Sequence, residues 1–210
     1  HNDIRQFQGC GHIITPSHGM NNTIHTAIAV WEWPSMFDMA QKLKGVRLDL
    51  AEYRRPDPAC APVHAKAAGL YMICTLSKHA AEKDGFDDAL MLDYRGRVSE
   101  ATGANIFLAI DGALHTPDPD CFLNGITRRT VIDLARRNGY EIVQRHIKPE
   151  EMVQATEAFL TGTAVEVTPI ASIGEYQFTP GKVCETLMKA YDAEVRRGSD
   201  KAALITGSAA

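Results

Sequence analysis

The stretch 88–117 constrains the fold of this chain most, because apolar β-type runs follow one another there with only short turns between them. A run over 88–93 ends at the turn Arg95-Gly96, and a second run covers 97–110. Asp111-Gly112 separates that run from a third, and an Asp-Gly pair in this position is typical of a two-residue hairpin. We therefore expect a compact group of hairpin strands in this part of the chain.

The segments on either side alternate loosely between helix and strand. We expect further strands at 12–15, 23–33, 46–53, 141–147 and 157–170, the last broken at Thr161-Gly162-Thr163. We expect helices from Lys66 to about Asp84-Gly85, over 122–139 with Thr127 as its cap, over 148–151, and over 182–196. Loosely alternating helices and strands with hairpins among them favour an α+β fold over a doubly wound sheet.

Composition excludes several classes of partner. The 210 residues are 45% hydrophobic and carry a net charge of −4, with the basic residues scattered, so no patch for nucleic acid is predicted. There is no apolar run of membrane-spanning length and no charged-then-apolar leader, so we expect a cytoplasmic protein without a membrane partner. Five cysteines without CxxC spacing predict reduced, mostly buried thiols and no metal site.

Lys66 stands at the start of a stretch, 64–82, that otherwise has the composition of a buried helix. Its neighbours are small or neutral, which would let a flat ligand approach and would leave the ammonium poorly solvated. A desolvated lysine loses its proton readily and becomes a nucleophile toward carbonyl carbon. The alternative is an ordinary solvated surface lysine.

Three further polar features accompany this lysine. Glu100 is the carboxylate residue of SEATGAN, a polar segment that interrupts apolar β sequence. It could have a functional role, and the alternative is that it is an ordinary solvated turn residue. Gly125-Ile126-Thr127 opens a helix whose free N–H groups and dipole suit a phosphate. Thr161-Gly162-Thr163 is a second cluster of hydroxyls and amides suited to an anion.

These features together suit pyridoxal 5'-phosphate (PLP). A lysine would form a Schiff base with its aldehyde, a carboxylate would keep its pyridine nitrogen protonated, and the anion cradles would hold its phosphate. Each feature alone is weakly specific. Their combination therefore suggests a PLP site.

Four strings carry a resemblance to a known family: HAKAAGLY, SEATGANIF, GITRRTV and TGTAVEVTP, in this order. From about Thr23 to Arg197 the chain resembles the branched-chain amino acid aminotransferases of the fold type IV PLP enzymes. The resemblance implies the large domain of that fold, a mixed β pseudo-barrel with surrounding helices. It also implies a homodimer or higher homo-oligomer.

The resemblance further implies roles for residues within the four strings or close to them. Lys66 would be the catalytic Schiff-base lysine, and Glu100 would pair with the pyridine nitrogen. The other cofactor-binding residues would be Tyr71 at the phenolic oxygen, Leu123 near the ring, and Ile126, Thr127 and Thr163 at the phosphate. The amides of Thr163 and Ala164 would face the substrate carboxylate.

Family members also carry an N-terminal small domain that supplies an arginine to the phosphate. We expect 1–36 to be a remnant of that domain, 37–45 the interdomain loop, 46–197 the PLP-binding large domain and 198–210 a flexible tail. A phosphate without its arginine loses a strong charge-assisted contact. We therefore expect this form to be truncated, to bind PLP weakly, and to be weakly active or inactive.

The implied activity moves the amino group of leucine, isoleucine or valine to 2-oxoglutarate through a ping-pong mechanism between PLP and pyridoxamine phosphate. The small-molecule partners would be amino acids and 2-oxo acids. A D-amino acid aminotransferase or an aminodeoxychorismate lyase of the same fold would use the same lysine and glutamate. An inactive fragment that keeps the fold is the alternative of another class.

Overall fold

The computed structural model describes residues 2–10, 24–32 and 43–197, and the chain divides into two units, His1–Met36 and Phe37–Ala210. In the first unit, β1 (Asn2–Cys10) and β2 (Ile24–Glu32) pair antiparallel along their full length. The strand predicted at 23–33 is confirmed as β2. We expected residues 1–22 to form a loop with at most a short strand at 12–15, and this is wrong because 2–10 form strand β1. Pairing with β2 stabilises this segment although its local sequence pattern is weak. Residues 12–15 lie outside the described residues.

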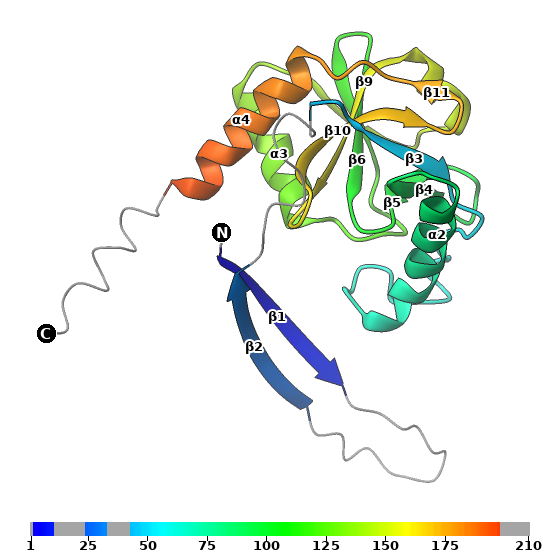
Figure 1. The fold of residues 1–210 in the computed structure, drawn as a ribbon, viewed down its shortest axis with the longest axis vertical. Coiled ribbons are helices and arrows are strands. Elements are labelled where there is room, and N and C mark those ends of the chain that lie inside the picture. The colour runs from blue at the N-terminus through cyan, green and yellow to red at the C-terminus, as the bar shows by residue number, and fades with distance from the viewer. Residues whose placement is uncertain (1, 11–23, 33–42, 198–210) are drawn as a thin grey trace, which may run out of the picture. The chain divides into compact units, whose positions relative to one another are not determined.

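The second unit is built on a ring of strands that closes on itself (Figure 1). The ring contains β3 (Val46–Leu50), β4 (Asp88–Leu92), β5 (Val98–Ala101), β6 (Asn105–Ile110), β9 (Ala155–Gly162) and β10 (Glu166–Ile173). Strand β3 pairs parallel with both β4 and β10, whereas the other neighbours in the ring pair antiparallel. The predicted α+β fold with a mixed β pseudo-barrel is confirmed.

Further strands extend the sheet beyond the ring: β7 (Ala113–Pro117), β8 (Ile142–Arg145) and the short β11 (Tyr176–Gln177), which was not predicted. The turn Asp111-Gly112 joins β6 to β7, and both of its residues have positive φ, 49° and 80°. That geometry is the reason an Asp-Gly pair is found there. The hairpin predicted from this dipeptide is confirmed.

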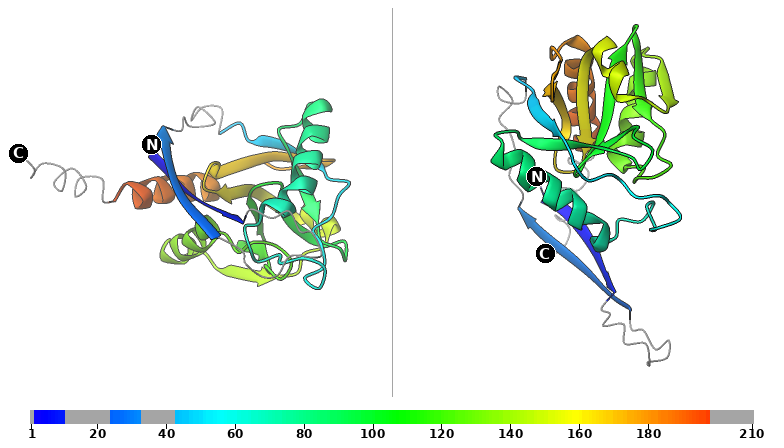
Figure 2. Two further views of the ribbon diagram at one scale, coloured as in Figure 1. Left: turned by 90° about the horizontal axis from the view of Figure 1, so that it is seen from below. Right: turned by 90° about the vertical axis from the view of Figure 1, so that its right-hand side faces the viewer.

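The helices cover the barrel on two sides. They are η1 (Ala68–Leu70), α2 (Tyr71–Lys83), α3 (Ile126–Arg137), η2 (Pro149–Gln154) and α4 (Lys182–Arg196), where η marks a 3₁₀ helix. Figure 2 shows α2 across the barrel from α3 and α4. Helix α2 ends at Lys83 and α4 spans Lys182 to Arg196, as predicted. Among the described residues, no helix has the length and apolarity that a membrane span requires.

Three predictions about helices are wrong. The α-helix expected from Lys66 begins only at Tyr71, because a hydrogen-bonded turn at 62–65 and the 3₁₀ helix η1 come first. Helix α3 begins at Ile126 and not at 122, and its N-cap is Gly125; Thr127 lies buried inside the first turn and does not cap it. Helix α2 is not a buried helix, because only Cys74, Ser77 and Ala81 form its buried stripe. Apolar composition alone did not reveal that a single face of α2 packs against the sheet.

Apolar side chains fill both faces of the central strands, which explains why every residue of β6 is buried. Ile106 and Leu108 belong to one core cluster, with Leu48, Leu90 and Ile170 from other strands of the ring. Phe107 alternates with them and belongs to a second cluster, formed with α3 and α4. Its ring stacks on that of Phe159 with the centroids 5.0 Å apart. This two-sided burial fixes the register of β6.

Glu157 attaches α4 to the barrel. Glu157 is only 9% exposed, and its carboxylate accepts hydrogen bonds from the N–H groups of Gly181 (3.1 Å), Val183 (3.2 Å) and Cys184 (2.9 Å) at the start of the helix. A carboxylate in this position satisfies unpaired donors and complements the helix dipole.

We therefore expect Glu157→Gln to lower the free energy of unfolding by about 2 kcal/mol, because the amide replaces a charged acceptor and turns a donor toward N–H groups. Urea denaturation measures the change. Glu185→Gln is the matched control, since Glu185 lies in the same first turn but is exposed. Equal losses in the two variants would contradict this account of the α4 cap.

Candidate active site

A cavity of about 150 Å³ collects the residues predicted to bind the cofactor. It is lined by Arg55 and by four further parts of the chain: the 65–74 segment, the β5–β6 connection, the start of α3 and the end of β9. Predicted residues in its wall are Lys66, Tyr71, Glu100, Leu123, Ile126, Thr127 and Thr163. Ala164, predicted beside the substrate carboxylate, is not among the lining residues. The structure therefore brings together segments that are far apart in the chain.

Lys66 lies five residues before α2, in a loop between a turn at Val63, which is buried, and η1. Lys66 itself is exposed, as are His64, Ala65 and Ala68. The prediction that its small neighbours leave the ammonium poorly solvated is therefore wrong. Small side chains exclude little water when the segment that carries them lies at the rim of a cavity.

Glu100 is the buried carboxylate of the cavity, with 9% of its surface exposed. Its Oε1 lies 3.3 Å from Nε of Arg55, and its Oε2 accepts a hydrogen bond of 3.1 Å from Nδ2 of Asn105. Burial raises the pKa of Glu100 to about 8, and the charge of Arg55 acts in the opposite direction. The alternative of a solvated turn residue is excluded.

Arg55 is a site residue that the sequence analysis missed. It is 4% exposed, lines the cavity and donates from Nη1 to Sγ of Cys74 at 3.3 Å. Its Nε–H is not aligned on Glu100, so the two form an ion pair without a well-directed hydrogen bond. A backbone bond from Arg55 to Leu92 holds the segment against the sheet. No local signal in the sequence distinguishes Arg55 from its neighbour Arg54, which is exposed.

The start of α3 is the anion-binding end of the cavity. The first bond of the helical ladder runs from Arg129 N–H to Gly125 O at 3.1 Å, so the amides of Ile126, Thr127 and Arg128 precede that ladder. Such amides, at the positive end of the helix dipole, favour an anion. Ile126 is 74% exposed. This geometry agrees with a phosphate cradle at the predicted residues.

The second predicted cluster reaches the same cavity. Thr161 and Gly162 end β9, and Thr163 follows in the turn to β10. Thr161 is 1% exposed whereas Thr163 is exposed. Thr163 is thus the hydroxyl of this cluster that solvent or a ligand can reach.

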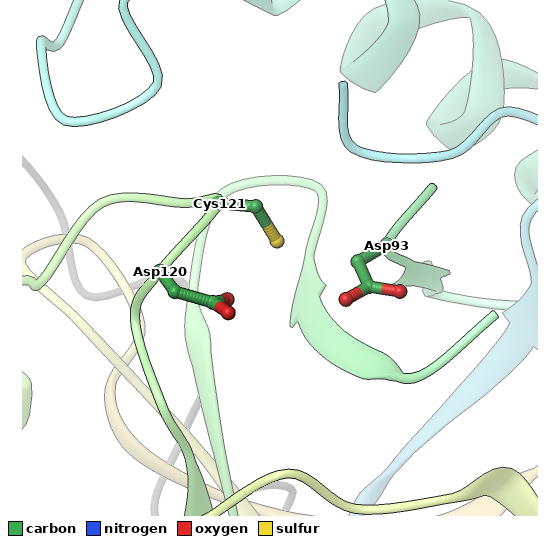
Figure 3. Close-up of side chains that lie close together, drawn as sticks. All are labelled: Asp93, Asp120 and Cys121. Atoms are coloured by element: carbon green, nitrogen blue, oxygen red, sulfur yellow. The ribbon is translucent and has the colours of Figure 1, made fainter. Parts of the chain in front are cut away.

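A separate group of acidic and thiol side chains lies outside this cavity (Figure 3). In the described part of the chain, Asp93, Asp120 and Cys121 have ligand atoms within 4.8 Å of one another. Arg95 binds both carboxylates, donating to Asp93 from Nε at 2.8 Å and to Asp120 from Nη2 at 2.7 Å. Burial and the two carboxylates raise the pKa of the Cys121 thiol to about 12. The positive charge in this group comes from arginine, so we interpret it as an ion-pair network.

With this geometry described, comparison with known proteins gives the family. The protein-family model for class IV amino-transferases matches residues 7–173. The chain belongs to this family. This chain is 37% identical over 171 residues to the branched-chain-amino-acid aminotransferase of Pseudomonas aeruginosa. The matched region covers 80% of this chain and 56% of that relative. The resemblance noted from the four strings is confirmed.

Solved structures show the same fold. One is the branched-chain aminotransferase of the thermophilic archaeon Thermoproteus uzoniensis, crystallised with norvaline. It matches this chain with a TM-score of 0.85 at 32% identity, and the match covers 94% of this chain and 66% of the solved chain. The Escherichia coli branched-chain amino acid aminotransferase has a TM-score of 0.85 at 28% identity, with coverages of 91% and 65%. The chain thus spans less than two thirds of these structures.

The raised pKa of Glu100 predicts a pH-dependent stability of the ligand-free chain. Between the ordinary value of 4.5 and about 8, the folded state binds more protons than the unfolded state. The free energy of unfolding must therefore fall as the pH rises through this window. In Glu100→Gln this contribution is absent, so the fall between pH 5 and pH 8 should be smaller. Urea denaturation at both pH values measures it.

Glu150→Gln, at an exposed glutamate, is the control and should keep the wild-type pH dependence. If Glu100→Gln and the wild type lost stability equally between the two pH values, the carboxyl would not be desolvated as described.

Proposed function

We propose that this protein is a PLP-dependent aminotransferase that moves the amino group of leucine, isoleucine or valine to 2-oxoglutarate by a ping-pong mechanism. One observation carries the proposal: in a class IV aminotransferase chain, Lys66, the buried Glu100 and the start of α3 line one cavity. These are an amine, a carboxylate and an anion cradle, the three groups that PLP requires.

The residues present fit the cofactor. PLP, when bound, acts as the electron sink for the bonds that change at the substrate carbon. Glu100, which is buried and lies beside Arg55, would accept a hydrogen bond from the protonated pyridine nitrogen. The amides at the start of α3 and the hydroxyls of Thr127 and Thr163 would hold the phosphate, and Leu123 would pack on the ring; all of these residues line the cavity.

Lys66 has two tasks in this proposal. Its Nζ would hold the cofactor covalently through the aldehyde carbon, with loss of water, and once freed by the substrate amine it would accept the proton that leaves the substrate Cα. Its exposed position at the cavity rim is compatible with both tasks, because the substrate enters from solvent. Tyr71, which lines the same wall, would contact the cofactor's phenolic oxygen.

The proposed substrates are supported by ligands of similar enzymes. One branched-chain amino acid aminotransferase, with a TM-score of 0.82 at 33% identity, has been crystallised with 4-methylvaleric acid, a branched aliphatic acid. Another structure, with a TM-score of 0.83, holds N-(5'-phosphopyridoxyl)-L-glutamate, which joins the cofactor to glutamate, the amino acid that corresponds to 2-oxoglutarate. For this chain, we assign the substrate carboxylate to Thr163, which lines the cavity, and to the adjoining amide of Ala164.

The test of the proposed function is a panel of L- and D-amino acids, each offered with 2-oxoglutarate to the PLP-loaded chain. We expect glutamate to form with L-leucine, L-isoleucine and L-valine, at the low rate expected for a chain that binds PLP weakly. Turnover of D-amino acids alone would indicate a D-amino acid aminotransferase and would contradict the proposal. A chain that takes up no PLP and remains colourless would contradict it as well.

For Lys66→Ala we expect transamination to fall by about 10²-fold or more, because the change removes the group that transfers the proton. The far-ultraviolet circular dichroism should stay unchanged, since Lys66 is exposed. Borohydride reduction of the PLP-loaded wild type, followed by peptide mapping, should place the label on Lys66.

Lys78→Ala is the matched control, since Lys78 lies on the neighbouring helix and pairs with Glu82 at 3.9 Å. It should retain activity. A borohydride label on Lys78, or full activity in Lys66→Ala, would show that the reactive lysine has been misassigned.

A further inference from the structure

Within residues 43–197, the side chain of Asn105 hydrogen-bonds to both the Glu100 carboxylate and the anion-binding end of the cavity. Its Nδ2 donates to Glu100 Oε2 at 3.1 Å and to the backbone oxygen of Leu123 at 3.0 Å. Its Oδ1 accepts the N–H of Gly125 at 3.2 Å. With 4% of its surface exposed, it makes these bonds largely out of water.

These three bonds fix the orientation of the amide group. A flipped amide would place its oxygen against the carboxylate of Glu100 and its NH₂ against the N–H of Gly125, so both contacts would be repulsive. The backbone holds the same arrangement, because Glu100 on β5 pairs with Asn105 on β6. Paired residues of neighbouring strands point to the same side of the sheet.

Gly125 is matched to this amide. A Cβ added at Gly125 would lie 2.5 Å from Oδ1 of Asn105, which no ordinary contact allows. Only glycine therefore lets the loop before α3 approach closely enough for its N–H to reach Asn105. The start of α3 and the position of Asn105 thus depend on each other.

Asn105 acts on the two ends of the site in different ways. At Glu100 it donates to a carboxylate oxygen, which favours the ionised form beside Arg55. At Gly125 it binds the N–H that precedes α3, so the following amides of Ile126 and Thr127 keep a fixed direction. A ligand with a cationic ring nitrogen and a phosphate would meet both ends at once.

We propose that Asn105 is a positioning residue that sets the distance and direction between the Glu100 carboxylate and the phosphate-binding amides of α3, so that both engage PLP together. This inference deepens the proposed function and rests on it. Asn105 touches neither the reacting carbon nor Lys66 in this account. It acts through Glu100 and Gly125.

The test uses the full chain with Asn105→Ala, Glu100→Gln and the double variant, titrated with PLP and separately with inorganic phosphate. We expect Asn105→Ala to raise the Kd of PLP by roughly 10- to 100-fold, the range for losing a hydrogen bond to a charged group. The Kd of inorganic phosphate should rise too, by about fivefold, because the α3 amides lose their direction. Asn138→Ala, which removes a side-chain bond at the other end of α3, should change neither value.

The double variant measures the coupling between Asn105 and Glu100 in PLP binding. A residue that only stabilised the fold would show no such coupling. Glu100→Gln should raise the Kd of PLP in the wild-type chain and also in the Asn105→Ala variant. The fold-increase in the variant should be at least about five times smaller, because the effects of substitutions at interacting residues do not add. Multiplicative effects, or unchanged Kd values alongside a lowered Tm, would overturn the proposal. If Asn105→Ala does not fold, Asn105→Asp keeps the size of the side chain and replaces a donor with an acceptor beside Glu100, so the same comparison applies.

The phosphate titration separates this inference from the proposed function. If the wild type takes up no PLP, the proposed function fails, and the response of the phosphate Kd to Asn105→Ala then decides the inference alone. A Kd for phosphate that stays within about twofold of wild type would overturn it, since coupled residues change binding by more than that.

Discussion

The site depends on a carboxylate held away from water. Glu100 has almost no access to solvent, and its neighbours are one cation, Arg55, and one amide donor, Asn105. A buried charge without partners would be very costly, so the carboxylate requires these groups. Its raised pKa shows that they compensate burial only in part. A cationic ring nitrogen placed beside it would supply the missing compensation, which is why this feature supports a PLP site.

Closure of the barrel is what places these groups together. Strand β9 lies between β6 and β10 and completes the ring, which aligns Asn105 on β6 with Thr161 on β9. Arg55 follows β3 and is held against the sheet by its backbone bond to Leu92 and by a parallel bridge with Asp93. The cavity therefore lies at one end of the barrel strands β5, β6 and β9, where Arg55, the 65–74 segment and the start of α3 meet them. A rigid barrel with functional connections is a common way to position a site.

Features encoded within a few residues could be predicted from the sequence. The hairpin at Asp111-Gly112, the end of α3 at Asn138-Gly139 and the bounds of α4 follow from local backbone preferences. The residues proposed to bind the cofactor were found through their motifs, and the structure places them around one cavity. Non-local features could not be predicted. The pairing of β1 with β2 and the contact between Arg55 and Glu100 join residues far apart in sequence, and no local pattern marks either.

The central claim is that one ligand, PLP, joins Glu100 to the start of α3 within reach of Lys66. A crystal structure of the chain with PLP tests this most directly. The account predicts the pyridine nitrogen within hydrogen-bonding distance of the Glu100 carboxylate, the phosphate at the amides of Ile126 and Thr127, and Nζ of Lys66 bonded to the aldehyde carbon. PLP bound outside this cavity, or with its phosphate at Glu100 and its ring nitrogen at α3, would contradict it.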